Sequence, residues 1–182
     1  MKDSTPSNVT KLTVIDTVER ILIAELKSMV YDHQGSAFIK FINIAVGIEY
    51  FGACLDVHAF QDFNKSEERF NNALKKLFPK KYEKYAKSGA EIYFFRDFRG
   101  TFIHQIRPGK NVVVTHRNES KREGTTHLKK TKSGDLVLVL EDFFDDFEKA
   151  GKALIKKAKD GKLPTKKDQQ NYIRLVSIQN NG

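Results

Sequence analysis

The sequence predicts a mainly α-helical protein, an up-and-down bundle of four to five helices with a small antiparallel β-meander inserted into it. Apolar residues recur at intervals of three and four through most of residues 9–107, as in amphipathic helices. β-branched runs and turn residues replace that period over residues 110–141, and the helical period returns over residues 142–180. We expect one domain spanning residues 1–182, with residues 1–8 as a flexible lead.

Five helices are expected before the β-meander. The first follows a cap at Ser7 or Asn8, and the second follows a cap at Ser36 and is apolar nearly all round, so it should run through the centre of the bundle. Pro79 ends the third helix, and Pro108 with Gly109 ends the fifth. The expected spans are residues 9–31, 37–58, 64–78, 80–87 and 90–106.

The rest of the chain alternates between predicted strands and helices. Strands are expected at 112–114, 125–132 and 136–140, with a tight turn at 133–135 between the last two. The returning helical period predicts a helix over 143–159 and a last one over 167–178.

Charge is distributed unevenly along the chain. The formal net charge is +9, yet residues 1–62 hold 5 Lys and Arg against 8 Asp and Glu, so the positive excess lies entirely in residues 63–182. A surface that faces a polyanion would therefore belong to the later part of the chain.

The cysteine content and the hydropathy of the chain indicate the cellular compartment in which the protein is expected. Cys54 is the only cysteine in the sequence, so no disulfide can form within the chain, which fits a reducing compartment. No secretory signal opens the chain, and Lys40, Glu49 and Asp56 interrupt its longest apolar stretch. A core helix explains that stretch better than a membrane span, so we expect a cytoplasmic protein with no membrane partner.

Polar side chains concentrate on the helix expected at 90–106. At about 100° per residue, Asp97, Thr101 and His104 share one stripe, and Arg99 is long enough to bend toward the imidazole of His104. Gly100 lies inside this helix, where it costs about 1 kcal/mol relative to Ala, so a partner helix crossing at Gly100 would explain its presence.

Arg99, four intervening residues and then His104 resemble the R-x4-6-H motif of HEPN domains, many of which are ribonucleases of toxin–antitoxin and antiviral defence systems. The resemblance covers the predicted helices, with the β-meander as an insertion. It implies metal-independent RNA cleavage with His104 as general base or acid and Arg99 holding the phosphate, or a relative that only binds RNA or nucleotides. It also implies a two-fold homodimer with two motifs face to face.

Four residues are assigned supporting roles around this motif. Asp97 would orient His104 together with Arg96, while Glu49 and Asp56 share a face of the second helix and could meet Arg96 or Arg99. Under the alternative interpretation, Arg99 simply pairs with Glu49 or Asp56, and His104 caps carbonyl groups near the end of its helix.

Basic residues that follow the motif are candidates for binding a nucleic-acid backbone. The alternative is that lysines on edge strands prevent aggregation between sheets. The candidates are Arg107, Lys110, Arg117, Lys121, Arg122, Lys129, Lys130 and Lys132.

No metal or cofactor is expected. His58 and Asp62 are four residues apart, but two residues do not make a metal site, and the other histidines show no closing pattern; His116 and His127 could instead pair across the β-meander. The first hypothesis is therefore a HEPN-like metal-independent endoribonuclease, or an RNA-binding or nucleotide-binding relative, acting in stress or phage defence with a neutralising protein partner. The second is a non-catalytic dimeric interaction module of a bacterial regulatory or defence system.

Overall fold

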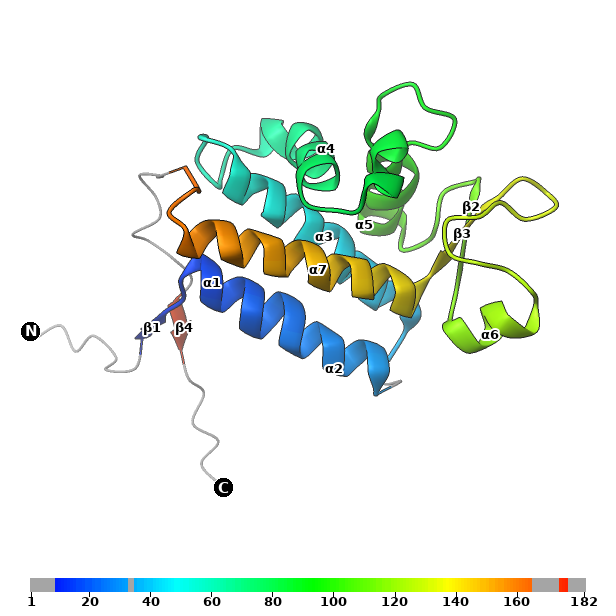
Figure 1. Ribbon diagram of the computed structural model, residues 1–182, viewed down its shortest axis with the longest axis horizontal. Helices are drawn as coiled ribbons and strands as arrows, with labels where there is room; N and C mark the ends of the chain where they lie inside the picture. Colours follow the sequence, from blue (N-terminus) through cyan, green and yellow to red (C-terminus); the bar gives the residue numbers. More distant parts are fainter. Residues whose placement is uncertain (1–8, 33–34, 165–173, 177–182) are drawn as a thin grey trace, which may run out of the picture.

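The computed structural model describes residues 9–32, 35–164 and 174–176 and shows a helical bundle with two small two-stranded sheets (Figure 1). α7 (Leu140–Lys159) lies between the first helical rod and α3 (Ala37–Leu55), and it contacts both. The mainly α-helical fold class is confirmed by this arrangement.

The first rod is one continuous run of α1 (Val14–Asp16), the π-helical η1 (Thr17–Glu25) and α2 (Leu26–Tyr31). Its cap is Thr13, whose hydroxyl accepts a hydrogen bond from the Asp16 amide at 3.1 Å while the Asp16 carboxylate accepts one from the Thr13 amide at 2.9 Å. This reciprocal capping box places the start several residues after the predicted one. The predicted caps Ser7 and Asn8 lie outside the described residues.

Residues just before this rod form a strand rather than the predicted first turn of helix. β1 (Val9–Lys11) pairs antiparallel with β4 (Arg174–Val176). The helix predicted over 167–178 is therefore wrong at residues 174–176, and the remainder of that span lies outside the described residues.

The second and third predicted helices are confirmed. Ser36 caps α3, its hydroxyl accepting from the Phe38 amide at 3.2 Å. α4 (Ser66–Lys76) follows the short 3-10 helix η2 (Phe63–Lys65) and crosses α3 closely. A methyl group at Gly52 would lie 1.8 Å from the carbonyl oxygen of Arg69, so the crossing requires glycine.

The helix that carries the HEPN-like motif differs in form from the predicted one. After the 3-10 helix η3 (Lys80–Ala86), π-helical turns form η4 (Phe95–Gly100), and α5 (Thr101–Gln105) continues it. Ile106 ends the rod in a left-handed conformation, with φ 55°. Because a π-helix has more residues per turn than an α-helix, the predicted 100° stripe does not describe this segment.

The predicted antiparallel β-meander is wrong. β2 (Val112–Thr115) and β3 (Leu136–Val139) pair in parallel, with Val112 opposite Leu136. A parallel pair needs a crossover connection, and this one contains α6 (Arg117–Arg122), a helix that was not predicted between the first two expected strands. Of the strand predicted over 125–132, the structure forms only an isolated antiparallel bridge between Lys130 and Leu136.

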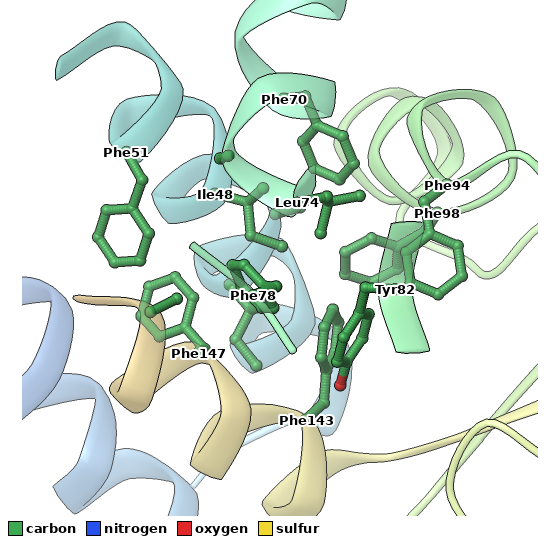
Figure 2. Close-up of a cluster of buried hydrophobic side chains, with 14 of the residues drawn as sticks. Ile48, Phe51, Phe70, Leu74, Phe78, Tyr82, Phe94, Phe98, Phe143 and Phe147 are labelled. Atoms are coloured by element: carbon green, nitrogen blue, oxygen red, sulfur yellow. The ribbon is translucent and has the colours of Figure 1, made fainter. Parts of the chain in front are cut away.

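Aromatic side chains fill the centre of the bundle (Figure 2). Phe143 of α7 stacks on Tyr82 with ring centroids 5.7 Å apart, and it meets the edge of Phe98 at 5.2 Å. Phe51 stacks on Phe147 at 4.7 Å. This packing fixes η3, η4 and α7 against one another and thereby positions the motif helix.

α3 is the one helix in the described part of the chain that is long and apolar enough to cross a membrane. More than half of its apolar stretch is buried inside the bundle. It therefore serves as the core helix that the sequence predicted.

Candidate functional site

Arg99 lies on η4 and is held by Glu49 of α3. Its Nε donates to Oε2 of Glu49 at 2.9 Å, and its Nη2 lies 2.8 Å from the same oxygen. The guanidinium also sits 5.2 Å from the ring centroid of Phe95. The two charged side chains are 17% and 22% exposed, so the pair is at the rim of the bundle and still reaches solvent. The contact between Arg99 and Glu49 that the alternative interpretation predicted is thus confirmed.

Asp56 does not join this pair, and its supporting role is corrected. Its Oδ2 accepts from Nε of Arg69 at 2.6 Å, and Arg69 is almost fully buried. The same guanidinium donates to the carbonyl oxygens of Ala59, Phe60 and Asp62. Asp56 therefore belongs to a buried network that shapes the connection between α3 and α4.

Asp97 and Arg96 bind each other rather than His104, which corrects their predicted role. Arg96 donates from Nε and Nη2 to the two carboxylate oxygens of Asp97 at 2.6 and 2.7 Å, and this pairing raises the pKa of Arg96. Asp97 Oδ2 also accepts from the Tyr93 amide at 2.8 Å, and its carbonyl accepts from the Gly109 amide at 2.9 Å. Asp97 thus fastens the start of η4 to the chain that leaves α5.

His104 is exposed near the end of α5. Within the part of the chain that the structure describes, its imidazole forms no hydrogen bond or ion pair, so it does not cap the helix as the alternative interpretation proposed. An exposed imidazole can exchange protons with a bound molecule.

A hollow of about 540 Å³, here called the α5 hollow, opens beside the end of this helix. Arg107 donates from Nε to Oε1 of Gln105 at 2.9 Å, while Lys110 is exposed and pairs with no acid among the described residues. The lining of the α5 hollow is mainly polar and basic and consists of Thr101, Gln105, Arg107, Pro108, Gly109 and Lys110.

Ile106, the residue that ends α5, has an unusual backbone conformation. It is 58% exposed and adopts a left-handed conformation that a β-branched residue rarely accepts. Backbone strain of this kind concentrates at functional sites, so the strained residue supports the end of α5 as the candidate functional site.

Gly100 does not meet another part of the described chain. A methyl group there would contact only the carbonyl oxygen of Phe95 in its own helix, at 3.2 Å. The surface beside Gly100 is therefore open to a partner, as the predicted crossing of a second copy requires.

The basic residues predicted to bind nucleic acid fall into two groups. Arg117 is engaged with Asp142 and Asp145 at 2.7 Å each; burial opposes its charged form, but the hydrogen bonds to both carboxylates outweigh burial and raise its pKa. Arg122 pairs with Glu119 at 3.1 Å, and Lys130 pairs with Glu91 at 2.6 Å. Of the predicted nucleic-acid-binding residues, five have no acidic partner among the described residues: Arg107, Lys110, Lys121, Lys129 and Lys132.

A buried network that the sequence did not reveal joins η3, β3 and α7. The Val139 amide donates to Nδ1 of His127 at 3.1 Å, so the proton of the neutral imidazole is on Nε2, 2.8 Å from the Tyr82 hydroxyl. Tyr82 donates in turn to Asp146 at 3.0 Å. Burial, with the nearby charge of Lys81, lowers the pKa of His127 to about 4. The network joins η3 to α7 and to the amide of Val139 at the end of β3.

His116 does not pair with His127 as predicted. Its Nδ1 lies 3.2 Å from Glu141, whose other oxygen accepts from the Arg117 amide at 2.8 Å. Glu141 thereby fastens α6 to α7. These contacts could not be predicted from local sequence spacing, because the residues involved are more than 20 positions apart.

Neither a metal-binding cluster among the described residues nor a similar known protein adds to this description of the site. Among residues 9–32, 35–164 and 174–176, no three His, Cys, Asp or Glu side chains are grouped so that they could hold a metal ion. Comparisons with family models, curated proteins and solved structures found no match. The interpretation of the site therefore depends on its own geometry and on the motif.

Proposed function

We propose that this protein binds single-stranded RNA at the end of α5 and cleaves it by metal-independent transesterification, as a HEPN-like endoribonuclease. The observation that carries the proposal is that α5 bears the exposed His104, five residues after Arg99, and that the same helix contributes Thr101 and Gln105 to the lining of the basic α5 hollow. Arg107 and Lys110 line that hollow and supply the positive charge that a phosphodiester needs.

The chemistry requires a base, an acid and a group that stabilises charge. The 2′-oxygen of a bound nucleotide attacks the adjacent phosphorus, and the bond to the 5′-oxygen of the next nucleotide breaks, leaving a 2′,3′-cyclic phosphate and a 5′-hydroxyl. The imidazole of His104 accepts the proton of the 2′-hydroxyl or donates one to the departing oxygen. A homodimer supplies a second imidazole for the other transfer.

Arg99 is assigned the role of holding the phosphate. Its Nε and Nη2 are used by Glu49, while Nη1 forms no hydrogen bond to the described residues. Glu49 holds the guanidinium at the rim, and a phosphate would compete with its carboxylate for the same donors. Glu49 is thus a positioning residue that also restrains Arg99.

A specific observation favours a second candidate, a non-catalytic dimeric interaction module. Ile39 and Val46 are seven residues apart on α3, so they share a face, and they are 45% and 48% exposed. Phe38, 39% exposed, packs beside Phe102 of α5 at a centroid distance of 6.1 Å. A second copy covering this face would make the Arg99–Glu49 pair a structural contact near an interface. Under both candidate functions, we propose that the protein acts in the cytoplasm, in a defence system that includes a neutralising protein partner.

A salt-dependent gel shift with single-stranded RNA tests the binding site. Arg107→Ala with Lys110→Ala should weaken binding and reduce the slope of log affinity against log salt by about 1.4, because two phosphate contacts on a single strand are lost. The matched control is Lys156→Ala with Lys159→Ala, two exposed lysines at the far end of α7. Equal losses in both double variants would show that binding is not localised at the α5 hollow.

A further inference from the structure

A second hollow lies between η3, with the residues that follow it, and the segment that precedes β3. Its volume is about 410 Å³, which is within the range of small-molecule sites. We call it the η3 hollow. It shares no lining residue with the α5 hollow and is lined by Lys84, Tyr85, Ala90, Glu91, Ile92, Leu128, Lys129 and Lys130.

The charged lining of the η3 hollow is positive in balance. Lys130 is 2.6 Å from Oε1 of Glu91, and Lys84 lies 4.9 Å from the ring centroid of Tyr85. Lys129 is exposed and has no acidic partner among the described residues. Three lysines against one glutamate leave two positive charges, which match the charge of about −2 that a phosphate monoester carries near pH 7.

The floor of the hollow is apolar and rigid. Ile92 is 4% exposed, and Tyr85 stacks on Phe94 with ring planes 10° apart and centroids at 4.5 Å. Leu128 forms a wall and packs against the hydrophobic core. An apolar floor below charged lysines fits a molecule with an anionic end and a compact apolar part.

Leu128 adopts a left-handed conformation, with φ 61°, which costs conformational energy in a residue with a Cβ. Its amide donates to the carbonyl of Val137 at 2.8 Å, and the Val137 amide donates to the carbonyl of Lys129 at 2.9 Å. The preceding His127 is anchored on Tyr82. The chain is thereby fixed on both sides of Leu128, and the two lysines that follow are presented at the hollow by a rigid backbone.

We propose that the η3 hollow is a binding site for a small phosphate monoester with a compact apolar part. Lys84 and Lys129 hold the phosphate, and Lys130 joins them when its contact with Glu91 opens. The apolar part lies against Ile92 and Leu128. The site is separate from the α5 hollow and does not depend on the proposed ribonuclease activity.

Titration calorimetry on the full chain with phenyl phosphate tests this proposal, with inorganic phosphate and benzoate as comparison ligands. Phenyl phosphate should bind at least tenfold more tightly than either, because inorganic phosphate lacks the apolar part and benzoate carries one negative charge. Amide resonances of residues 128–130 should shift in nuclear magnetic resonance spectra when phenyl phosphate is added.

Two double variants locate the site. Lys84→Ala with Lys129→Ala should weaken phenyl phosphate binding tenfold or more, while Lys156→Ala with Lys159→Ala, both exposed and outside the hollow, should leave it unchanged. All four lysines are exposed, so circular dichroism should show folded proteins. The proposal is overturned if phenyl phosphate does not bind at millimolar concentration, if inorganic phosphate binds equally well, or if both double variants lose the same affinity.

Discussion

Glu49 of α3 and Arg99 of η4 form an ion pair in which one carboxylate oxygen lies 2.9 Å from Nε and 2.8 Å from Nη2 of the guanidinium. The pair connects the core helix to the helix that carries the HEPN-like motif. It also places a negative charge beside the guanidinium that the proposed chemistry assigns to phosphate, so the strength of this contact bears directly on that proposal.

Replacing Glu49 with Gln should release Arg99 toward a ligand. We expect RNA affinity to rise by roughly fivefold, corresponding to about 1 kcal/mol, because the competing carboxylate charge is removed. The pair is partly exposed, so the free energy of unfolding should fall by no more than about 1 kcal/mol. Gel shifts and urea denaturation measure the two effects, and a loss of RNA affinity would contradict the restraining role of Glu49.

Two glycine substitutions should differ sharply in stability. Gly52→Ala places a methyl group 1.8 Å from the Arg69 carbonyl oxygen, so α3 and α4 must separate and the free energy of unfolding should fall by about 3 kcal/mol or more. Gly100→Ala meets only the Phe95 carbonyl at 3.2 Å, so it should change that free energy by less than about 1 kcal/mol. Urea denaturation of both variants measures the difference.

The same Gly100→Ala variant tests the dimer. If a second copy crosses at Gly100, the added methyl group should weaken self-association in sedimentation equilibrium while the fold is kept. Self-association equal to that of the unaltered protein would place any dimer interface elsewhere.

Ile106→Gly should stabilise the protein. Glycine adopts φ 55° without the Cβ penalty, which amounts to about 1 kcal/mol. The matched control is Ile106→Ala, which removes most of the same exposed side chain but retains the Cβ. The glycine variant should unfold about 2–4 °C above the alanine variant in a thermal melt. If alanine is equally stable, the left-handed conformation carries no strain.

Stability should fall as the pH drops from about 6.5 to about 4, with His127 as a main cause. Burial lowers its pKa to about 4, so the unfolded chain takes up a proton in this window that the folded protein does not. The contribution of His127, on the order of 3 kcal/mol, is present above pH 6.5 and lost toward pH 4. Urea denaturation of the unaltered protein and of His127→Gln at pH 7.5 and pH 4.5 should show the smaller pH dependence in the variant. Equal pH dependence would assign the effect to carboxylates.

Local patterns in the sequence predicted much of the bundle. The apolar period and the Ser36 cap gave α3, and the acidic start and basic end of α7 match the helix dipole. These features depend on residues three or four positions apart, so one stretch of sequence contains all the information.

Pairing between distant residues was beyond such patterns. Val112 and Leu136 are partners in a parallel sheet, and no local signal distinguishes that from a hairpin. The turn at Gly134 does form, with the Thr131 amide donating to the Asp135 carbonyl at 2.8 Å, but it joins a bridge rather than two full strands.

In the candidate site, too, local patterns could be predicted from the sequence but contacts between distant residues could not. Arg99 and His104 are candidates because of their spacing in the sequence, whereas the π-helical turns of η4 changed the faces on which neighbouring side chains lie. Asp56 was assigned to Arg99 by helical geometry alone, but the α3–α4 crossing brings Arg69 to it first.

Cleavage of single-stranded RNA in excess EDTA, with analysis of the product ends, tests the central claim most directly. The account predicts 2′,3′-cyclic phosphate and 5′-hydroxyl ends, with rates at least about 100-fold lower for folded His104→Ala and Arg99→Ala proteins. Intact RNA after incubation with the unaltered protein, or full activity in both variants, would contradict it.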